Sequence, residues 1–319
     1  MSTRANRTFG PAVSRRLGRS LGVEIVPAKV CTFNCVYCEA GRTTRLTTER
    51  REYVPVDEIL YDVRQRFDQG VKADYVTITG AGEPTLHSGL AAIVDGIRRI
   101  TRTPIAVLTN GSLLGERDVQ KALAGVDLVV PSLDAGTDEE FHRVNRPASG
   151  FTVEALVTGM ESFRARYKGQ IWLEVLLVAG LTDSEESVKR IARLAERIRP
   201  DRIQLNTVVR PPAEASAGAV PAERLAALAR LFTPAAEVIA VVPHRHSATT
   251  TIAVGRSDVL ALVERRPCPL EEIAEGLGMA PDAVAVHLKA LEDSGLVQRQ
   301  ERDGVVYYTA RQESGETEV

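Results

Sequence analysis

Six apolar runs, each followed by a segment with helical periodicity, occupy most of the first 240 residues of this 319-residue chain. The runs are rich in Val, Ile and Leu and mostly lack clean alternation, as expected for parallel strands buried on both faces. Strands are predicted at residues 22–28, 75–80, 104–110, 127–133, 171–178 and 202–208. Helices are predicted at residues 56–69, 88–101, 116–124, 152–167, 184–199 and 222–232.

Consecutive strand–helix units imply an α/β fold with one parallel sheet and right-handed crossovers. Their periodicity fits both a barrel-like (β/α) sheet and a doubly wound sheet. In either arrangement, the chemistry belongs at the C-terminal ends of the strands. Residues that directly follow a predicted strand are therefore the first candidates for a functional site.

The pattern changes after Pro243, and we predict a second, smaller domain. Three helices and a β-hairpin with an Asp303-Gly304 turn have the outline of a winged helix-turn-helix. The predicted helices cover 258–265, 269–276 and 281–293, and the strands lie near 296–300 and 305–309. The predicted divisions are 1–245 for the larger domain, 246–256 for a linker, 257–312 for the winged helix and 313–319 for an acidic flexible tail.

Composition excludes several classes of protein. Hydrophobic residues make up 44% and charged residues 26% of the chain, which is ordinary globular usage. Four cysteines in a chain of this length cannot form a disulfide scaffold. No apolar run approaches the ~18 residues of a membrane span, and the N-terminus has no secretory signal, so we expect a cytoplasmic protein without membrane contact.

Charge is uneven although the net charge is only −2. Residues 1–53 hold ten Arg or Lys and four Glu, which fits either a solvated arm or a surface that meets an anionic substrate. The predicted recognition helix carries Lys289 and His287 against Asp282, Glu292 and Asp293. Because phosphate contacts dominate DNA affinity, this helix favours docking to protein, RNA or the larger domain over DNA.

The strongest chemical signal is Cys31, Cys35 and Cys38, three of the four cysteines within eight residues. Soft thiolates select zinc or an iron–sulfur cluster. Structural zinc normally takes four protein ligands, and a zinc site completed by a distant His remains an alternative. Three thiolates on a four-iron cluster would leave one iron open to an exogenous ligand. Cys268 is predicted to be an ordinary semi-buried cysteine.

The spacing C-x3-C-x-aromatic-C, with Tyr37 at the aromatic position, resembles the radical SAM superfamily. Further motifs extend the resemblance: Gly-Ala-Gly-Glu-Pro at 80–84, Thr-Asn-Gly at 109–111 and Ser-Leu-Asp at 132–134. The run FGPAVSRRLGRSLGVEIVPAKVCTFNCVYC, together with LNTVVRPP, resembles the wyosine-synthase-like branch. Archaeal members of that branch have further N-terminal cysteines, whereas this chain has none before Cys31.

The resemblance implies a partial (β/α)6 barrel with a [4Fe–4S] cluster on Cys31, Cys35 and Cys38. The open iron would chelate the amino and carboxylate groups of S-adenosylmethionine. A low-potential donor such as flavodoxin or ferredoxin would supply the electron that cleaves it to methionine and a 5'-deoxyadenosyl radical. That radical would abstract hydrogen from a substrate that the sequence leaves open: a peptide, a protein, a small molecule or a tRNA base.

The resemblance also implies contacts to S-adenosylmethionine. Gly80 and Gly82 would let the backbone approach its methionine moiety, and Glu83 would accept from its ammonium. Asn110, Ser132 and Asp134 would meet ribose hydroxyls, and Tyr37 would lie near the adenine. Each position also has a purely structural interpretation as a turn, cap or packing residue.

Three polar residues in the last two predicted strands are further candidates. Glu174 interrupts an apolar strand, and a buried carboxylate requires a partner, either a cofactor or substrate group or an internal Arg. Asn206 and Arg210 lie at the end of the sixth strand, where Arg210 could neutralise an anionic substrate.

Two further predictions concern segments near the cluster. Lys29, two residues before Cys31, could tune the cluster, and residues 141–147 are predicted as a loop above the barrel mouth.

A regulator is the alternative from another class. An iron–sulfur sensor could control DNA binding through the winged helix. Its support is the domain architecture, and the acidic recognition helix argues against it.

Overall fold

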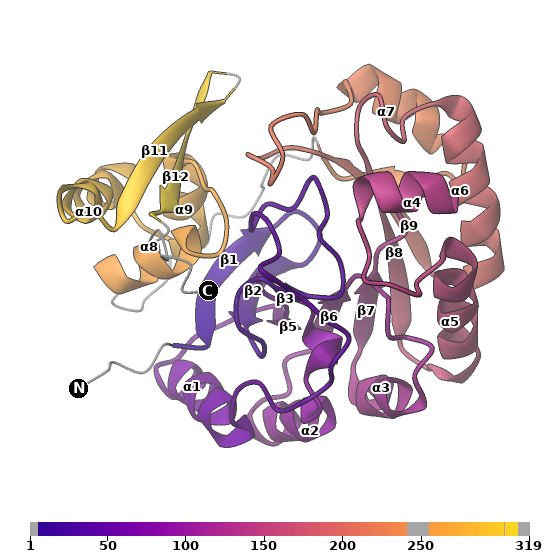
Figure 1. The fold of residues 1–319 in the computed structure, drawn as a ribbon. Helices are drawn as coiled ribbons and strands as arrows, with labels where there is room; N and C mark the ends of the chain where they lie inside the picture. Colours follow the sequence, from indigo (N-terminus) through magenta and orange to yellow (C-terminus); the bar gives the residue numbers. More distant parts are fainter. Residues whose placement is uncertain (1–5, 241–254, 303, 312–319) are drawn as a thin grey trace, which may run out of the picture.

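An eight-stranded sheet forms the scaffold of the larger part of the molecule (Figure 1). The structure is a computed structural model that describes residues 6–240, 255–302 and 304–311. The strand order is β1-β2-β5-β6-β7-β8-β9-β10. Their bounds are Thr8–Ser14, Gly18–Val23, Tyr75–Ile78, Ile105–Thr109, Leu128–Pro131, Gln170–Leu177, Arg202–Thr207 and Glu237–Val238. The six strands β2 to β9 pair in parallel, β1 adds an antiparallel edge, and β10 adds a parallel one.

Helices between the strands cover the outer face of the sheet (Figure 1). They are α1 Val56–Asp68, α2 Leu90–Ile100, α3 Arg117–Ala122, α4 Asp138–Val144, α5 Val153–Arg166, α6 Glu185–Ile198 and α7 Ala222–Ala229, with 3-10 turns η1 Pro84–Leu86 and η2 Leu123–Gly125. Side-chain caps explain several starts, since Thr137, Thr152 and Ser184 each accept from a backbone N–H in the first turn.

Both faces of the sheet are buried. Val107, Val129 and Leu173 face the outer helices in the main core, whereas Ala106 and Leu128 pack against each other on the opposite face. The inner cluster also includes Leu17, Val130 and Trp172. Side chains that alternate between two apolar environments explain the near-continuous hydrophobic runs. The expected partial (β/α)6 barrel is thus confirmed.

The N-terminal edge differs from expectation. The first parallel strand is Gly18–Val23 rather than 22–28, because Ile25 and Val26 are buried within the irregular segment that follows β2, without strand pairing, and Pro27 lacks a backbone N–H. The interpretation of the basic N-terminus as a solvated arm is also wrong. Residues Thr8–Ser14 form β1, which pairs with β2 in a hairpin.

The predicted loop at 141–147 is also wrong in its first half, which belongs to α4. Thr137 caps this helix by accepting from the backbone N–H of Glu140 at 3.2 Å. Phe141 is buried and contacts the edge of the Phe33 ring, with 5.2 Å between centroids. The helix therefore fixes the segment that follows it against residues 31–38, which carry the three clustered cysteines and are called the cysteine loop below.

The C-terminal segment forms a winged helix with its own core. It comprises α8 Arg256–Val263, α9 Leu270–Leu277, α10 Pro281–Asp293 and the antiparallel pair β11 Val297–Arg302 and β12 Val305–Ala310. Val259, Ile273 and Leu288 are buried in that core, as is Cys268, which is more buried than expected. Asp303 of the predicted turn, most of the predicted linker and the predicted tail lie outside the described residues.

The winged helix packs against β1, at the open edge of the barrel (Figure 1). Phe9 and Ala12 of β1 join its apolar core. Ion pairs cross the contact, with 3.1 Å between Arg66 and Asp258 and 2.8 Å between Glu24 and Arg265. The expected docking onto the larger domain is therefore present, and it uses α8, α9 and the wing strands β11 and β12 rather than the recognition helix α10. Among the described residues, no helix is both long and apolar enough to cross a bilayer.

Candidate functional site

The cysteine loop follows β2 and lies at the C-terminal edge of the parallel strands. A short parallel pair, β3 Val30–Cys31 with β4 Arg45–Leu46, anchors its two ends. Cys31, Cys35 and Cys38 are free, partly exposed residues. The Cys31 sulfur accepts from the Phe33 backbone N–H at 3.4 Å and from Asn110 Nδ2 at 3.5 Å, and the Cys35 sulfur accepts from Asn145 Nδ2 at 3.5 Å. Donors aimed at sulfur stabilise an anionic cluster.

Burial sets the protonation of these thiols in the absence of a metal. It raises the pKa of Cys31 to about 12 and raises the pKa of Cys35 and of Cys38 above the usual value. A buried thiol becomes a thiolate when a metal supplies the compensating positive charge. The donor set therefore fits a bound iron–sulfur group, which would convert all three thiols into ligands.

A single-ion site does not fit as well. Among residues 6–240, 255–302 and 304–311, no three His, Cys, Asp or Glu side chains are grouped so that they could hold one metal ion. The interpretation of zinc completed by a distant His therefore has no support within that part of the chain.

Glu83 organises the ends of two neighbouring strands. Its carboxylate is buried and accepts from Thr85 N, Thr85 Oγ1 and Thr109 Oγ1 on one oxygen and from Asn110 N at 2.8 Å on the other. Burial raises the pKa of Glu83, and these donors oppose that rise. The side chain thereby connects the turn after β5 to the residue that donates to Cys31. A contact from Glu83 to a cofactor ammonium stays a prediction.

The two glycines of the same turn allow close packing against the cysteine loop. A Cβ on Gly82 would lie 2.4 Å from the Val30 carbonyl oxygen, and one on Gly80 would lie 2.8 Å from Glu24 Cγ. Gly80 also has a φ of 152°, which disfavours a side chain. Lys29 donates its backbone N–H to the Ala81 carbonyl at 2.7 Å. The glycines therefore hold the turn beneath the cysteine loop.

A second buried network connects the loop to β7. The Tyr37 hydroxyl donates to Asp134, which also accepts from Asn145 Nδ2 at 2.8 Å and from the Leu176 N–H at 2.9 Å. Burial raises the pKa of Asp134 to about 6 and raises that of Tyr37 well above its usual value. Ser132, half-buried after β7, forms a backbone bridge with Glu174.

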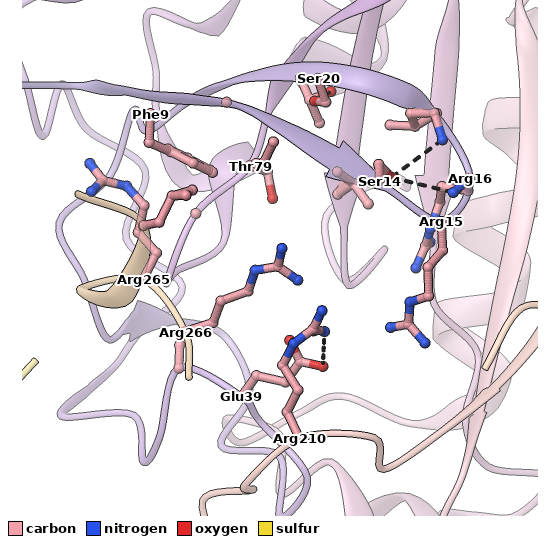
Figure 2. Close-up of a pocket in the computed structure, with 18 of the residues that line it drawn as sticks. Phe9, Ser14, Arg15, Arg16, Ser20, Glu39, Thr79, Arg210, Arg265 and Arg266 are labelled. Atoms are coloured by element: carbon pink, nitrogen blue, oxygen red, sulfur yellow. Dashed lines mark hydrogen bonds and ion pairs between the residues drawn. The ribbon is translucent and has the colours of Figure 1, made fainter. Parts of the chain in front are cut away.

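A cavity of about 400 Å³ lies beside this loop, between the barrel and the winged helix (Figure 2). Tyr37 and Cys38 line it from the cysteine loop, and Gly80, Glu174 and Asn206 line it from the strands. Leu262, Arg265 and Arg266 of the winged helix form the opposite wall. Cys31, Cys35, Gly82, Glu83, Asn110, Ser132 and Asp134 do not line this cavity.

Glu174 has the internal arginine partner that the sequence left as one alternative. The Arg16 guanidinium lies 2.6 Å from its carboxylate, and Asn206 Nδ2 donates to the same oxygen at 3.0 Å. Burial, the largest single effect, would raise the pKa of Glu174, but Arg16, Asn206 and Arg15 together outweigh it and lower the pKa below the usual value. Arg16 comes from the turn between β1 and β2, so this pair connects the N-terminal hairpin to β8.

Arg210 connects the cysteine loop to the winged helix. It forms bidentate pairs with Glu39 at 3.0 Å and with Glu272 at 2.7 Å, and Arg266 lies 2.6 Å from Glu272. Burial, the largest effect, would lower the pKa of Arg210, and Glu39 and Glu272 outweigh it. Its two carboxylate partners come from this chain, whereas the sequence suggested a substrate anion.

Sequence reasoning missed several residues of this region. Asn145 joins Cys35, Tyr37 and Asp134, yet it is separated by over a hundred positions from the loop and carries no local motif. Arg15 and Arg16 were visible only as part of a basic segment. Arg266 and Glu272 gave no signal at all because their role depends on domain docking.

Comparison with known proteins agrees with this geometry. The model of the radical SAM superfamily matches residues 25–195, and that of the bacterial regulatory protein arsR family matches residues 254–299. A radical SAM methyltransferase from Sphaerobacter thermophilus has a similar fold, with a TM-score of 0.50 and 18% identity over 69% of this chain and 64% of that one.

Two relatives align along nearly the whole chain. A UPF0026 protein of Helicobacter pylori (strain J99 / ATCC 700824) is 33% identical over 308 residues, 95% of this chain and 97% of that protein. A protein named GTPase Obg from Brachyspira hyodysenteriae is 34% identical over 307 residues, 96% of this chain, which spans only 45% of that protein. The chain belongs to the radical SAM superfamily, whose enzymes use a [4Fe–4S] cluster and S-adenosylmethionine.

Proposed function

We propose that Cys31, Cys35 and Cys38 hold three irons of the [4Fe–4S] cluster and that the fourth iron binds S-adenosylmethionine beside the cavity. The observation that carries this proposal is the position of Cys38, which belongs to the three-cysteine loop and also lines the cavity. When bound and reduced, the two cofactors supply a 5'-deoxyadenosyl radical that abstracts hydrogen from a substrate.

The residues of the chain position and shield this chemistry. Asn110 and Asn145 orient Cys31 and Cys35 by donating to their sulfur atoms. Glu83 fixes Asn110 through the backbone N–H, and the Tyr37–Asp134 hydrogen bond fixes the segment before Cys38. These contacts act before any substrate enters, so they preorganise the site.

The predicted contacts to S-adenosylmethionine fall into two groups. Tyr37, Gly80, Glu174 and Asn206 line the cavity and are placed to contact a cofactor or substrate within it. Gly82, Glu83, Asn110, Ser132 and Asp134 form the strand-end layer outside it. We assign the cavity-lining residues to direct contacts and the others chiefly to support, with Glu83 Oε2 retaining capacity for the cofactor ammonium.

The winged helix, in this proposal, serves the enzyme as a wall of its cavity. Leu262, Arg265 and Arg266 line the cavity, and Arg302 donates to the carbonyl oxygens of Arg210 and Ala217 at 3.1 and 3.2 Å. A closed wall excludes water from reactive intermediates. The docked face is supplied by α8, α9 and the wing, so α10 remains free for a further partner.

An oxygen-free assay tests the proposal. Cluster-loaded protein is incubated with S-adenosylmethionine and dithionite, and 5'-deoxyadenosine and methionine are measured by mass spectrometry. We expect both products in equal amounts from the native protein and neither from Cys38→Ala. Failure of the fully loaded native protein to form 5'-deoxyadenosine, together with sequence-specific DNA retention at moderate salt, would support the regulator instead.

A low-potential protein such as flavodoxin or ferredoxin completes the proposed reaction as electron donor. Replacing dithionite with either reduced protein in the same assay tests this step. We expect 5'-deoxyadenosine to form with at least one of them. Product formation with dithionite but with neither reduced protein would contradict this choice of donor.

A further inference from the structure

The cavity is unusually rich in arginine. Five guanidinium-bearing residues line it, two from the β1–β2 turn, one after β9 and two from the winged helix: Arg15, Arg16, Arg210, Arg265 and Arg266. Figure 2 shows Arg15 and Arg16 on one side of the cavity and Arg210 and Arg266 on the other, whereas the Arg265 side chain lies beside Phe9. Segments far apart in the sequence therefore bring positive charge to one cavity.

Four of the five arginines have carboxylate partners within the chain. Arg16 pairs with Glu174, and Arg265 pairs with Glu24 at 2.8 Å. Arg210 and Arg266 share Glu272, and Arg210 also pairs with Glu39. These pairs fix the walls of the cavity and neutralise most of its charge.

Arg15 differs from the other four. Among the described residues, no carboxylate lies within ion-pair distance of its guanidinium. Among the described residues, its NH1 has two long contacts, at 3.5 Å each, to Asn206 Oδ1 and to the Ile239 carbonyl oxygen. Partial burial and the neighbouring Arg210 lower the pKa of Arg15 to about 10 although Glu39 and Glu174 oppose that shift, and the group stays charged at neutral pH. A half-buried guanidinium without a direct carboxylate contact retains donors for a bound oxyanion.

We propose that Arg15, supported by Arg16, binds a phosphate or carboxylate group of a small-molecule substrate inside this cavity. The inference rests on the proposed function, because it assigns the cavity beside Cys38 to the substrate of the same reaction. A planar guanidinium presents two parallel donors and so matches either oxyanion. The basic segment at the N-terminus thus acquires a chemical role through its hairpin turn.

Isothermal titration of the cluster-loaded protein with inorganic phosphate and pyrophosphate, in the presence of saturating S-adenosylmethionine, tests this site. We expect Arg15→Gln to weaken binding about tenfold to a hundredfold, the range for a lost charge-assisted hydrogen bond. Arg15→Lys keeps the charge but loses the fork, so an intermediate affinity is expected. Arg117→Gln, an equal charge change at an exposed position outside the cavity, is the control and should bind like the native protein.

Circular dichroism checks that each variant is folded. Absence of binding to the native protein, or equal binding by Arg15→Gln, overturns the inference. Displacement of phosphate by S-adenosylmethionine, or an equal loss of affinity for both in Arg15→Gln, also overturns it, because Arg15 would then hold the cofactor carboxylate. Phosphate binding without any formation of 5'-deoxyadenosine by the native protein would instead refute the proposed function and leave the anion site standing.

Discussion

The site has two halves that are built in different ways: the cysteine loop with its supporting motifs, called the cysteine half, and the arginines that line the cavity, called the arginine half. The cysteine half is local: its three thiols lie within eight residues, and its supporting motifs each follow directly on a strand. The arginine half is assembled from the N-terminal hairpin, the segment after β9 and the winged helix. The cysteine half lies within the segment that matches the superfamily, whereas Arg15, Arg16, Arg210, Arg265 and Arg266 all lie outside residues 25–195.

This difference distinguishes the part of the site that performs the chemistry common to the superfamily from the part that selects the substrate of this chain. A compact motif can be retained as a unit because its geometry depends on few distant contacts. The arginine half depends on a hairpin that reaches across the barrel and on a docked domain. We therefore assign the cysteine half to the common cofactors and the arginine half to the substrate of this chain.

The largest expected effect falls on the cysteine half. Substitution of Cys31, Cys35 or Cys38 by Ala should each abolish cluster incorporation, because three protein ligands leave none to spare. Cys268→Ala, in the winged-helix core, should keep its iron. Iron analysis and electron paramagnetic resonance of reconstituted protein measure both outcomes, and equal iron content in all four variants would refute the ligand assignment.

Arg16→Met is expected to have the largest effect on the arginine half. It leaves Glu174 buried without its cation, and breaking a buried ion pair costs roughly 3–5 kcal/mol of unfolding free energy. The folded-state pKa of Glu174 is lowered, so the pair stabilises the protein above the unfolded carboxyl pKa and loses this effect as pH falls through the folded pKa. Urea unfolding should therefore show a large difference from the native protein at pH 7 and a smaller one toward pH 4. A difference that is independent of pH would contradict this account.

Glu83→Gln tests the strand-end layer that supports the cysteine loop. The amide keeps the size of the side chain but removes the charge available to an ammonium group, so affinity for S-adenosylmethionine should fall by roughly tenfold. Iron content should stay at the native level because no ligand is changed. Calorimetry and iron analysis on one preparation separate these effects, and unchanged affinity would limit Glu83 to its structural contacts with Thr85, Thr109 and Asn110.

The smallest effect is expected on the recognition helix. Lys289 is exposed, and its ion-pair partner among the described residues is the exposed Asp293 on the same helix, at 3.5 Å. Lys289→Ala should change the unfolding free energy by less than about 0.5 kcal/mol and leave 5'-deoxyadenosine formation unchanged. A strong loss of product would show that α10 contributes to the reaction, contrary to the division described above.

Much of the barrel could be predicted because strand and helix periodicities are local. The strands at Ile105–Thr109 and Arg202–Thr207 end within one residue of their predicted bounds. The first strand was misplaced because Ile25 and Val26 are buried within the loop after β2, and their apolar side chains give the same sequence signal as a buried strand. The segment at 138–144 was missed as a helix because its single buried turn is too short to show periodicity.

The sequence alone determined the order of strand–helix units and the grouping of three thiols, since both depend on spacing along the chain. Tertiary structure decided which charges meet. Arg16 and Glu174 are 158 positions apart, and Arg210 meets Glu272 only because the winged helix docks on the barrel. A charge pattern records the sign of each residue but not its distance from a partner. Only the fold could therefore distinguish the paired arginines from Arg15.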